Sequence, residues 1–303
     1  MKKQYLIDYF KTNGNNETLD YSDFDLTKID ENKMNALMYA FYYNFSGCLN
    51  LTEIQMDYLI KNSDLSLQNK FNQNILMILF DYNSISQLLL TKEQIYFLIT
   101  HCDLKQQDKK LENALMYAID NNSRELLYLD EKCFEYLIKH SDLSLADRHG
   151  FNTLMCFLLH NREMNIFLKK DLLIYCLQNS DLLQKTTDDY YALTLAIKYN
   201  KPEKLNLDDN DFSYIIEKMN FLDNTTALKD MLNYFINADT AVDDFNIFWK
   251  NFKQKNYLLD FIKNNKSYKS LLDIYDVQVF DEKGILSESI ILDKKVLIKI
   301  KKI

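Results

Sequence analysis

The sequence predicts an all-α protein built from tandem pairs of antiparallel helices, and three observations support this fold class. First, 47% of the 303 residues are hydrophobic, which is enough for a large core. Second, the chain contains only 4 Gly and 1 Pro, too few for a sheet-rich fold with many tight turns. Third, several sequence columns recur every 39 residues without slippage, as expected for an α-solenoid of repeated units.

The repeat is defined by independent columns that keep one register. An Asp-Leu dipeptide recurs at Asp25-Leu26, Asp64-Leu65, Asp103-Leu104, Asp142-Leu143 and Asp181-Leu182. A leucine column follows at Leu37, Leu76, Leu115, Leu154, Leu193 and Leu232, and an aromatic column at Tyr58, Phe97, Tyr136, Tyr175 and Tyr214. Five full units therefore span 25–219. We expect an N-terminal cap over 1–24, and a degenerate sixth unit with a helical cap over 220–272.

Each unit is predicted to contain two helices that hide their apolar faces against neighbouring units. The first helix follows an asparagine whose side-chain oxygen can accept from free backbone amides, at Asn35, Asn74, Asn113 and Asn152. The second helix begins at a capping box, Thr52 with Gln55 and Thr91 with Gln94, and Asp130 and Asp208 occupy the same column. The aspartates of the Asp-Leu column are expected to accept hydrogen bonds from backbone amides in turns.

The fourth unit carries a resemblance to a known family. Its segment Asp147-Arg-His-Gly150-Phe-Asn-Thr-Leu-Met-Cys-Phe-Leu-Leu-His-Asn161 resembles the ankyrin repeat signature Asp-x-x-Gly-x-Thr-Pro-Leu-His-x-Ala. Asn35-Ala-Leu-Met-Tyr-Ala40 and Asn113-Ala-Leu-Met-Tyr-Ala118 are similar to its core. The units exceed the family's repeat by six residues, and the surplus falls between the two helices. The resemblance implies an ankyrin-like stack over roughly 25–240, with a HEAT-like helical pair as the structural alternative.

The C-terminal part is expected to close the stack and then to change character. Apolar and aromatic residues over 245–272 predict one or two closing helices. Residues 273–303 are β-like and basic, with strands expected at 277–280, 284–285 and 296–300 and a turn at 281–284. We interpret this segment as a small hairpin or tail; a recognition or export signal is the alternative.

Composition and charge limit the partners. A net charge near −8 disfavours nucleic acid, which needs clustered Lys and Arg on the protein. No run approaches the ~20 apolar residues of a membrane-spanning helix, so no membrane partner is expected. Five cysteines without a CxxC pair fit a reducing compartment. We expect a cytoplasmic protein that is monomeric alone, and delivery into another cell as an effector is an open possibility.

The sequence offers no arrangement that predicts catalysis, a cofactor or a metal. Common nucleotide-binding, metalloprotease and hydrolase motifs are absent. Cys156 and His160 lie one helical turn apart without further ligands in the sequence pattern. His101 and His140 share a column with Asn62 and Asn179, which predicts a turn that needs positive φ rather than a catalytic role.

The positive functional prediction concerns the surface. In ankyrin-like stacks, loop tips and the concave first-helix face bind partners, so the resemblance implies that this chain binds a folded protein partner there. Tyr, Phe, Met and Arg are enriched at interface cores. The candidate contact residues are Met34, Tyr42, Tyr43, Lys70, Phe71, Tyr82, Lys109, Lys110, Arg148, His149, Phe151, Tyr190 and Tyr199.

Three alternative roles stay open. The first is an inhibitor or immunity-type protein whose acidic face masks a basic enzyme or toxin. The second is an enzyme with its activity in residues 245–303. The third is a structural scaffold without a dedicated site.

Overall fold

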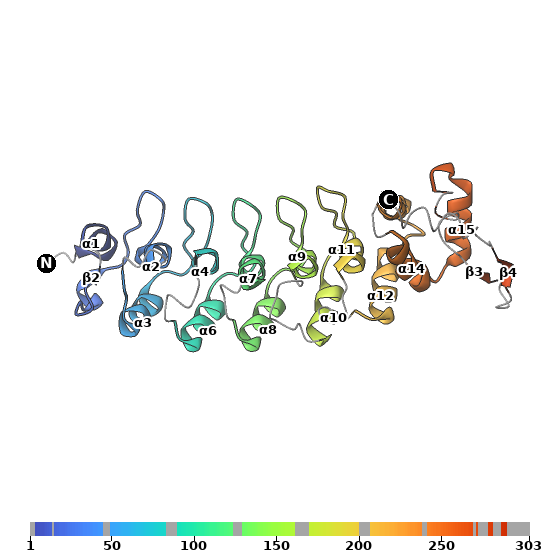
Figure 1. The fold of residues 1–303 in the computed structure, drawn as a ribbon. Coiled ribbons are helices and arrows are strands. Elements are labelled where there is room, and N and C mark those ends of the chain that lie inside the picture. Colours follow the sequence, from blue (N-terminus) through green and yellow to red (C-terminus); the bar gives the residue numbers. More distant parts are fainter. Residues whose placement is uncertain are drawn as a thin grey trace, which may run out of the picture. The chain divides into compact units, whose positions relative to one another are not determined.

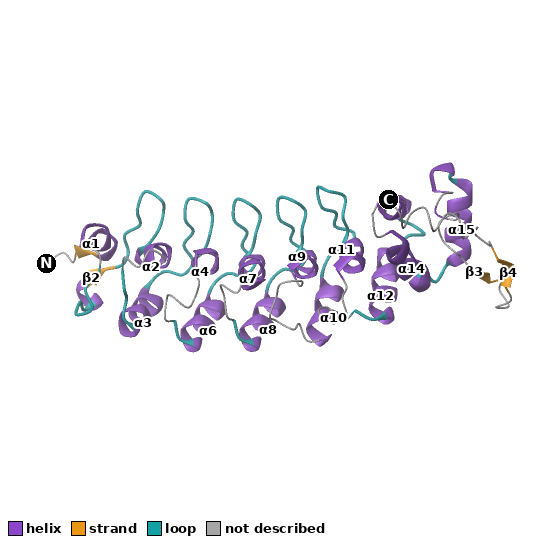
Figure 2. Cartoon of the chain, viewed as in Figure 1, coloured by secondary structure: helices purple, strands orange, loops and turns teal. Residues whose placement is uncertain are grey.

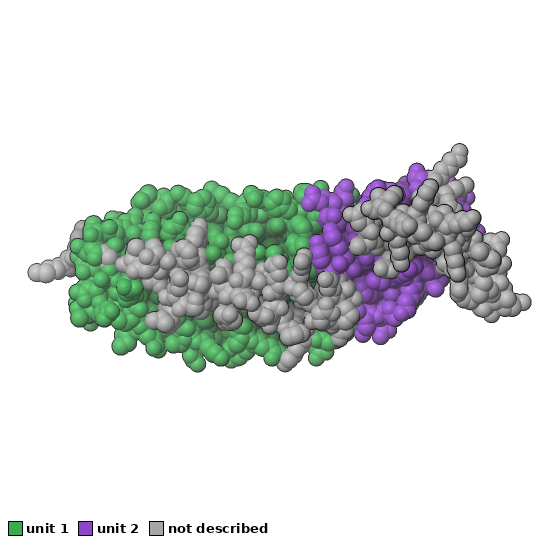
Figure 3. Space-filling view, viewed as in Figure 1, with its two compact units in different colours: residues 1–187 green, residues 188–303 purple. Residues whose placement is uncertain are grey.

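The protein is mostly helical in a computed structural model (Figure 2). The structure describes residues 4–13, 15–44, 49–82, 90–123, 129–160, 170–199, 207–237, 241–268, 271, 278–280 and 286–289. The chain divides into two compact units, residues 1–187 and 188–303, which Figure 3 colours separately. The boundary falls inside the fifth predicted repeat. Among the described helices, none combines the length and the apolar character needed to span a membrane.

The first unit has two helices in each of its four repeats (Figure 1). The pairs are α2 (Ala36–Asn44) and α3 (Glu53–Asn62), α4 (Ile75–Tyr82) and α6 (Lys92–His101), α7 (Ala114–Ser123) and α8 (Glu131–His140), and α9 (Thr153–His160) and α10 (Lys170–Asn179). The insertions predicted between the two helices of a repeat fall largely outside the described residues.

Helices at the same place in successive repeats pack against each other. In the first series α2 contacts α4, α4 contacts α7, and α7 contacts α9; in the second series α3 contacts α6, α6 contacts α8, and α8 contacts α10. The leucine column lies in the core, because Leu37, Leu76, Leu115 and Leu154 are all 0% exposed. Leu115 of α7 and Leu154 of α9 therefore lie at the same depth in equivalent helices, as a repeated helix pair requires.

A buried asparagine starts each first helix, as predicted. The side-chain oxygens of Asn35, Asn74, Asn113 and Asn152 accept from the amide three residues later at 2.8–3.0 Å. Three of these asparagines also donate to the next repeat. Their Nδ2 atoms reach the carbonyl of an aspartate 29 residues later, in the pairs Asn35–Asp64, Asn74–Asp103 and Asn152–Asp181. We call these inter-repeat hydrogen bonds the Asn clasps.

The second helices begin as predicted but end differently. Both capping boxes are present, at Thr52 and at Thr91, and Asp130 caps α8. The expectation that the Asn/His column needs positive φ is wrong. These four residues are the last residues of their helices, and each bonds through its side chain to the carbonyl four residues earlier, in the pairs Asn62–Tyr58, His101–Phe97, His140–Tyr136 and Asn179–Tyr175. The column therefore adds a side-chain hydrogen bond to a carbonyl in the last turn of each second helix.

The Asp-Leu column forms turns as predicted. In all five copies the aspartate Oδ1 accepts from the amide two residues later at 2.8–3.0 Å, and the residues are Asp25, Asp64, Asp103, Asp142 and Asp181. These aspartates are therefore structural turn residues rather than paired carboxylates of a reactive site.

The repeats are also linked through their loop tips by main-chain hydrogen bonds. The amides of Lys70, Lys109, Arg148 and Thr187 donate at 2.8–3.0 Å to the carbonyls of Asn32, Phe71, Lys110 and His149, respectively. We call this series the loop ladder. In Figure 2 the loops that carry it stand in a row, on the side of the helices away from α3, α6 and α8. The ladder holds neighbouring loop tips in register.

One residue in every loop tip has positive φ, and the positions are again 39 residues apart: Lys33, Asn72, Leu111, Gly150 and Asp189. Only Gly150 adopts this conformation without a side-chain penalty. A Cβ on Gly150 would lie 2.4 Å from the carbonyl oxygen of Lys185. The turn geometry is therefore kept in all five copies although the glycine occurs in one.

The N-terminal segment covers the first repeat. It contains the helix α1 (Leu6–Asn13), which contacts α2 and in which Leu6, Ile7 and Phe10 are buried. It is preceded by β1 (Gln4–Tyr5), which pairs in parallel with β2 (Phe24–Asp25) after the 3-10 turn η1 (Tyr21–Asp23). This two-residue pairing was not predicted.

The second unit is a smaller helical cluster. It contains α11 (Ala192–Tyr199), α12 (Asp209–Met219), α13 (Thr225–Asn237), α14 (Ala241–Asn251), α15 (Lys255–Asn264) and the turn η2 (Lys266–Tyr268). Phe221, Phe235, Phe245 and Phe248 are almost fully buried at its centre, which supports the expected closing helices. The β-like prediction is met by β3 (Gln278–Phe280), which pairs antiparallel with β4 (Leu286–Ser289). The strands expected at 284–285 and 296–300 lie outside the described residues.

Candidate interaction surface

Five of the candidate residues from the first two repeats lie around one pocket. The pocket has a volume of about 110 Å³ and is lined by Asn32, Met34, Tyr42, Tyr43, Asn69, Lys70 and Phe71. Loop 28–34, loop 67–73 and the C-terminal half of α2 contribute to it. We call it the aromatic pocket. Residues that are 26–39 positions apart in sequence are therefore brought together by the stacking of two repeats.

Each of the two loops that line the pocket is folded around one side chain. The Oδ1 atom of Asp30 accepts from the amides of Asn32 and Met34, both at 2.9 Å. In the next loop, the Oδ1 atom of Asn69 accepts from the amides at 71 and 73 at 2.8 and 3.0 Å. Lys70 then joins the two tips, since its Nζ atom donates to Asn32 Oδ1 at 2.7 Å.

Aromatic rings form the sides of the pocket. Tyr43 stacks on Tyr39 with ring centroids 4.2 Å apart, and Tyr42 meets Tyr43 edge-on at 4.9 Å. Phe71 is 46% exposed, and the Lys70 ammonium lies 5.1 Å from its ring centroid. A large exposed ring beside a cation is typical of a residue that becomes covered on binding.

A lysine that binds one buried and one exposed carboxylate lies at the outer edge of the first loop. Lys11 of α1 contacts Asp30 at 3.0 Å and Glu31 at 3.2 Å. Burial of Asp30 opposes ionisation, but the hydrogen bonds from the Met34 amide and from Lys11 outweigh it and lower the pKa of Asp30. The carboxylate is therefore charged at neutral pH and keeps the loop closed.

One candidate residue, Met34, is buried, and the side chain of another, Tyr82, is not described. Met34 is only 4% exposed, so the expectation that it projects into solvent is corrected: its amide is bonded to Asp30, and its side chain forms the floor of the aromatic pocket. The side chain of Tyr82 lies outside the described residues.

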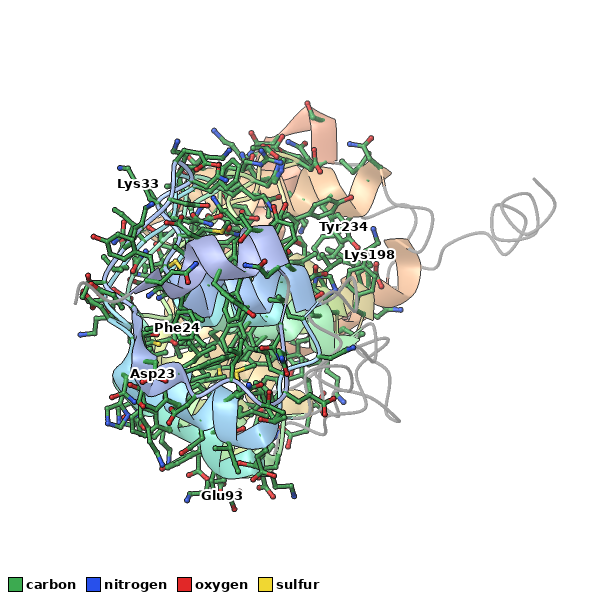
Figure 4. All side chains as sticks on the ribbon, turned by 90° about the vertical axis from the view of Figure 1, so that its left-hand side faces the viewer. Asp23, Phe24, Lys33, Glu93, Lys198 and Tyr234 are labelled. Carbon is green, nitrogen blue, oxygen red and sulfur yellow. The ribbon has the colours of Figure 1, made fainter. Side chains whose placement is uncertain are left out.

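The loop tips of the first unit carry a row of exposed cations. Lys33, Lys70, Lys109, Lys110 and Arg148 are all exposed, and they occupy the tips of four successive loops. We call this set the basic row; Figure 4 labels its first member, Lys33, at the edge of the molecule. The same loops carry the acids Asp30, Glu31, Asp108, Glu112 and Asp147, of which only Glu31 is exposed. Lys110 lies 3.6 Å from Glu112, and Lys11 binds Asp30 and Glu31. The exposed charges of these four tips are therefore mostly cations, although the whole chain is acidic.

Beneath the loop tips, a polar network crosses from the second repeat to the third. The Gln73 amide donates to Asp81 at 3.1 Å and to the hydroxyl of Tyr117 at 3.2 Å, and that hydroxyl donates to Asp108 at 2.9 Å. Burial raises the pKa of the Asp81 and Glu112 carboxyls. Both acids are partly buried below the loop tips.

The remaining candidates lie in later repeats. His149 is exposed at a tip and its Nε2 atom lies 3.1 Å from Arg148 Nε, while Phe151 is half-buried. Tyr190 and Tyr199 belong to the second unit, where both rings lie within 5.5 Å of the Lys198 ammonium, at 5.1 and 5.4 Å. The structure therefore brings Met34, Tyr42, Tyr43, Lys70 and Phe71 to one pocket, whereas Lys109, Lys110, Arg148 and His149 lie at other loop tips and Tyr190 and Tyr199 lie in the second unit.

The thiols and imidazoles of the described residues show no reactive arrangement. Burial raises the pKa of Cys102, Cys133 and Cys176 to about 12, which disfavours the nucleophilic thiolate. His160 lies 3.7 Å from Asp120. Within the described part of the chain, no three His, Cys, Asp or Glu side chains are grouped to hold a metal ion.

Sequence reasoning missed two contributors to this surface. Asn69 lines the aromatic pocket and folds its loop, and Lys33 is the first member of the basic row. Both could have been found from the 39-residue spacing, because Asn69 aligns with Asp30 and Asp108, and Lys33 with the positive-φ column. Comparison with known proteins adds no identification: no family model matches the chain, and no curated protein matches it.

Proposed function

We propose that residues 25–219 are ankyrin-like repeats stacked as an α-solenoid, and that this chain is a non-enzymatic module that binds a folded protein partner. The proposal for the repeats is supported in the first unit by the two series of packed helices, the Asn clasps and the loop ladder. Each of these features joins a repeat only to its neighbour, as nearest-neighbour stacking requires.

The observation that carries the binding function is the convergence of Tyr42, Tyr43, Lys70 and Phe71 on the aromatic pocket. Its volume of about 110 Å³ is well below the ~300–1,000 Å³ typical of small-molecule sites. A pocket of this size accommodates one apolar side chain from a partner surface. Interface energy is usually concentrated in such anchors, where an aromatic ring is covered and water is excluded.

The basic row extends this anchor into a larger contact surface. Its cations lie on successive tips that the loop ladder keeps in register, so they present charge at regular intervals. Exposed cations add little affinity individually, but they steer association and select a partner of complementary charge. A partner that inserts an apolar side chain into the aromatic pocket and places carboxylates along the tips fits both features.

The test is crosslinking from the pocket. A photoreactive benzoylphenylalanine in place of Phe71 should crosslink one defined protein in extracts of the native cell, or of the cell to which the protein is delivered. The same substitution at Tyr58, on α3 away from the loops, is the matched control. In the chain without the crosslinker, Phe71→Ala and Tyr43→Ala should each weaken binding of that protein by about tenfold or more.

Two results would contradict the proposal. One is a set of crosslinks that is identical from positions 71 and 58. The other is an identified partner whose affinity is unchanged by both alanine substitutions.

A second candidate function is the inhibitor that masks a basic enzyme or toxin. The observation that favours it is the set of partly buried carboxylates below the tips, Asp81, Glu112 and Asp120. Under this alternative, Asp120→Asn should weaken association with a basic protein, whereas Lys109→Gln should strengthen it. The reverse pattern is expected for the first function, so the two substitutions distinguish them.

A further inference from the structure

The second helices carry a cleft that the proposed function does not use. It lies between α3 and α6, has a volume of about 460 Å³, and is lined by Glu53, Asp57, Ile60, Lys61, Thr91, Glu93, Gln94 and Phe97. Figure 4 shows Glu93 at the opposite edge of the first unit from the loop-tip residue Lys33. The cleft is therefore on a different face from the aromatic pocket.

The next groove along, between α6 and α8, shows what such a space accommodates. There the ammonium of Lys132 lies 3.9 Å from the ring centroid of Tyr96. Tyr96 in turn meets Tyr136 edge-on, with centroids 5.8 Å apart. This groove is thus filled by the chain's own cation and two aromatic rings.

The repeat register allows the two grooves to be compared position by position. Glu93 of the α3–α6 cleft corresponds to Lys132, Asp57 corresponds to Tyr96, and Phe97 corresponds to Tyr136. The cation that fills one groove is replaced by a carboxylate in the other, and the ring beneath the cation is replaced by a second carboxylate. The α3–α6 cleft has therefore lost the side chains that fill its neighbour.

The α8–α10 groove is closed in another way. The hydroxyl of Tyr175 donates to the carbonyl of Lys139 at 3.3 Å, and so links the two helices. Phe97 occupies the same column but has no hydroxyl, so it cannot make this bond. The α3–α6 cleft thus has neither the lysine placed over an aromatic ring nor the tyrosine bridge of the two grooves that follow it; its own cation, Lys61, pairs with Asp57 instead.

The remaining lining suits a long basic side chain. Ile60, which is 2% exposed, and the Phe97 ring give an apolar floor along which a methylene stem can lie. Glu53, Asp57 and Glu93 supply carboxylates at the walls. Asp57 is paired with Lys61 at 2.7 Å, but both side chains are exposed, and such exposed i,i+4 pairs contribute little to stability. An incoming cation can therefore displace Lys61 readily.

We propose that the α3–α6 cleft binds an arginine or lysine side chain from a basic segment of a partner protein, in the place that Lys132 fills one repeat later. The head group would bind Glu93 and Asp57, and the stem would cover Ile60 and Phe97. This site is independent of the aromatic pocket, so either one can fail without the other.

The experiment uses the full chain with its isoleucine δ1-methyl groups isotope-labelled for NMR. The probe is an acetylated and amidated pentapeptide, Gly-Gly-Arg-Gly-Gly, and the control peptide has norleucine at its centre. The Ile60 methyl signal should shift saturably with the arginine peptide, and the norleucine peptide should bind about tenfold more weakly or worse. Ile99, the equivalent residue in the filled groove, serves as the internal control and should not shift.

Variants test the comparison in both directions. Asp57→Tyr with Glu93→Lys recreates the neighbouring filling and should abolish the Ile60 response, whereas Glu131→Lys on α8, which matches the charge change at position 93, should preserve it. Conversely, Tyr96→Asp with Lys132→Glu should open the α6–α8 groove and make Ile99 respond. Circular dichroism checks that each variant remains folded.

Any of the following results would overturn the proposal. If Ile60 does not respond, or responds equally to norleucine, the cleft does not select a basic side chain. If butylamine binds as tightly as the arginine peptide, the cleft is a site for small cations rather than for a protein segment. If the Ile60 signal shifts with protein concentration alone, a second copy of this chain occupies the cleft.

Discussion

The Asn clasp predicts that a single amide group contributes twice to stability. Asn74 is 1% exposed; its oxygen accepts from the Met77 amide at 2.9 Å and its Nδ2 atom donates to the Asp103 carbonyl at 2.9 Å. Asn74→Ala removes the helix cap, at about 1 kcal/mol, and one inter-repeat hydrogen bond, at about 1 kcal/mol. We therefore expect the free energy of unfolding to fall by about 2 kcal/mol.

Asn113 provides a matched control within the same chain. It is 0% exposed and caps α7 in the same way, but its Nδ2 atom is buried without a hydrogen-bond partner. Asn113→Ala should therefore lose only the cap, about 1 kcal/mol, and should relieve an unsatisfied donor. Urea denaturation followed by circular dichroism measures both variants. Equal losses for Asn74→Ala and Asn113→Ala would refute the contribution of the clasp.

Asn74→Asp separates the two hydrogen bonds further. The carboxylate can still cap α4, but it places an oxygen against the Asp103 carbonyl where the amide donated. Repulsion and burial should raise the pKa of this carboxyl in the folded state above its ordinary value of about 4. The variant should therefore be least stable at neutral pH. Its deficit relative to the native chain should shrink as the pH falls and the acid becomes a donor. A deficit that is independent of pH would contradict this explanation.

Three further predictions concern the loops and the network below them. Leu111→Gly should raise the free energy of unfolding, measured in urea, by about 1 kcal/mol, because a residue with a side chain is strained at φ 63° and the exposed Leu111 side chain makes little contact. A lower free energy of unfolding would show that the tip is not strained. Gly150→Ala should destabilise by more than 1 kcal/mol, roughly, since its Cβ would lie 2.4 Å from the Lys185 carbonyl; an unchanged denaturation midpoint would refute this close approach. Asp81→Asn should raise the free energy of unfolding at pH 7, because burial raises the pKa of Asp81 and the cost of ionising it in the folded state opposes folding above pH 3.8. The gain should vanish below that pH. A gain that persists there would exclude ionisation as the cause.

The features that could be predicted from sequence are those in which one residue type meets one local requirement. A leucine column buried at 0% exposure, asparagines before a helix and aspartates in turns are each recognised from a few neighbouring residues. Repetition then turns a weak local signal into a reliable one, because an error at one copy is not repeated at the others. For this reason the helix positions in the first four repeats were predictable.

Features that depend on contact between repeats were not predictable in the same way. Asn74 was identified as a cap, but nothing near it in sequence indicates that its second hydrogen bond goes to residue 103. Lys33 and Leu111 adopt positive φ because the fold imposes it, although neither residue type favours it. His101 was assigned to a turn, whereas it ends a helix and bonds to Phe97. The aromatic pocket was predicted as separate residues, and only stacking shows that they meet.

The loop ladder has a consequence for how such a protein can change over generations. Its links run between peptide groups, such as the Lys109 amide and the Phe71 carbonyl, so the side chains of the linked residues take no part in them. Exposed tip residues, apart from those that fold the loop such as Asp30, Asn69 and Gly150, can therefore be exchanged by mutation while the spacing between tips is retained. Selection for a new partner would then act on the exposed side chains of the tips, while the main-chain hydrogen bonds between the tips are kept.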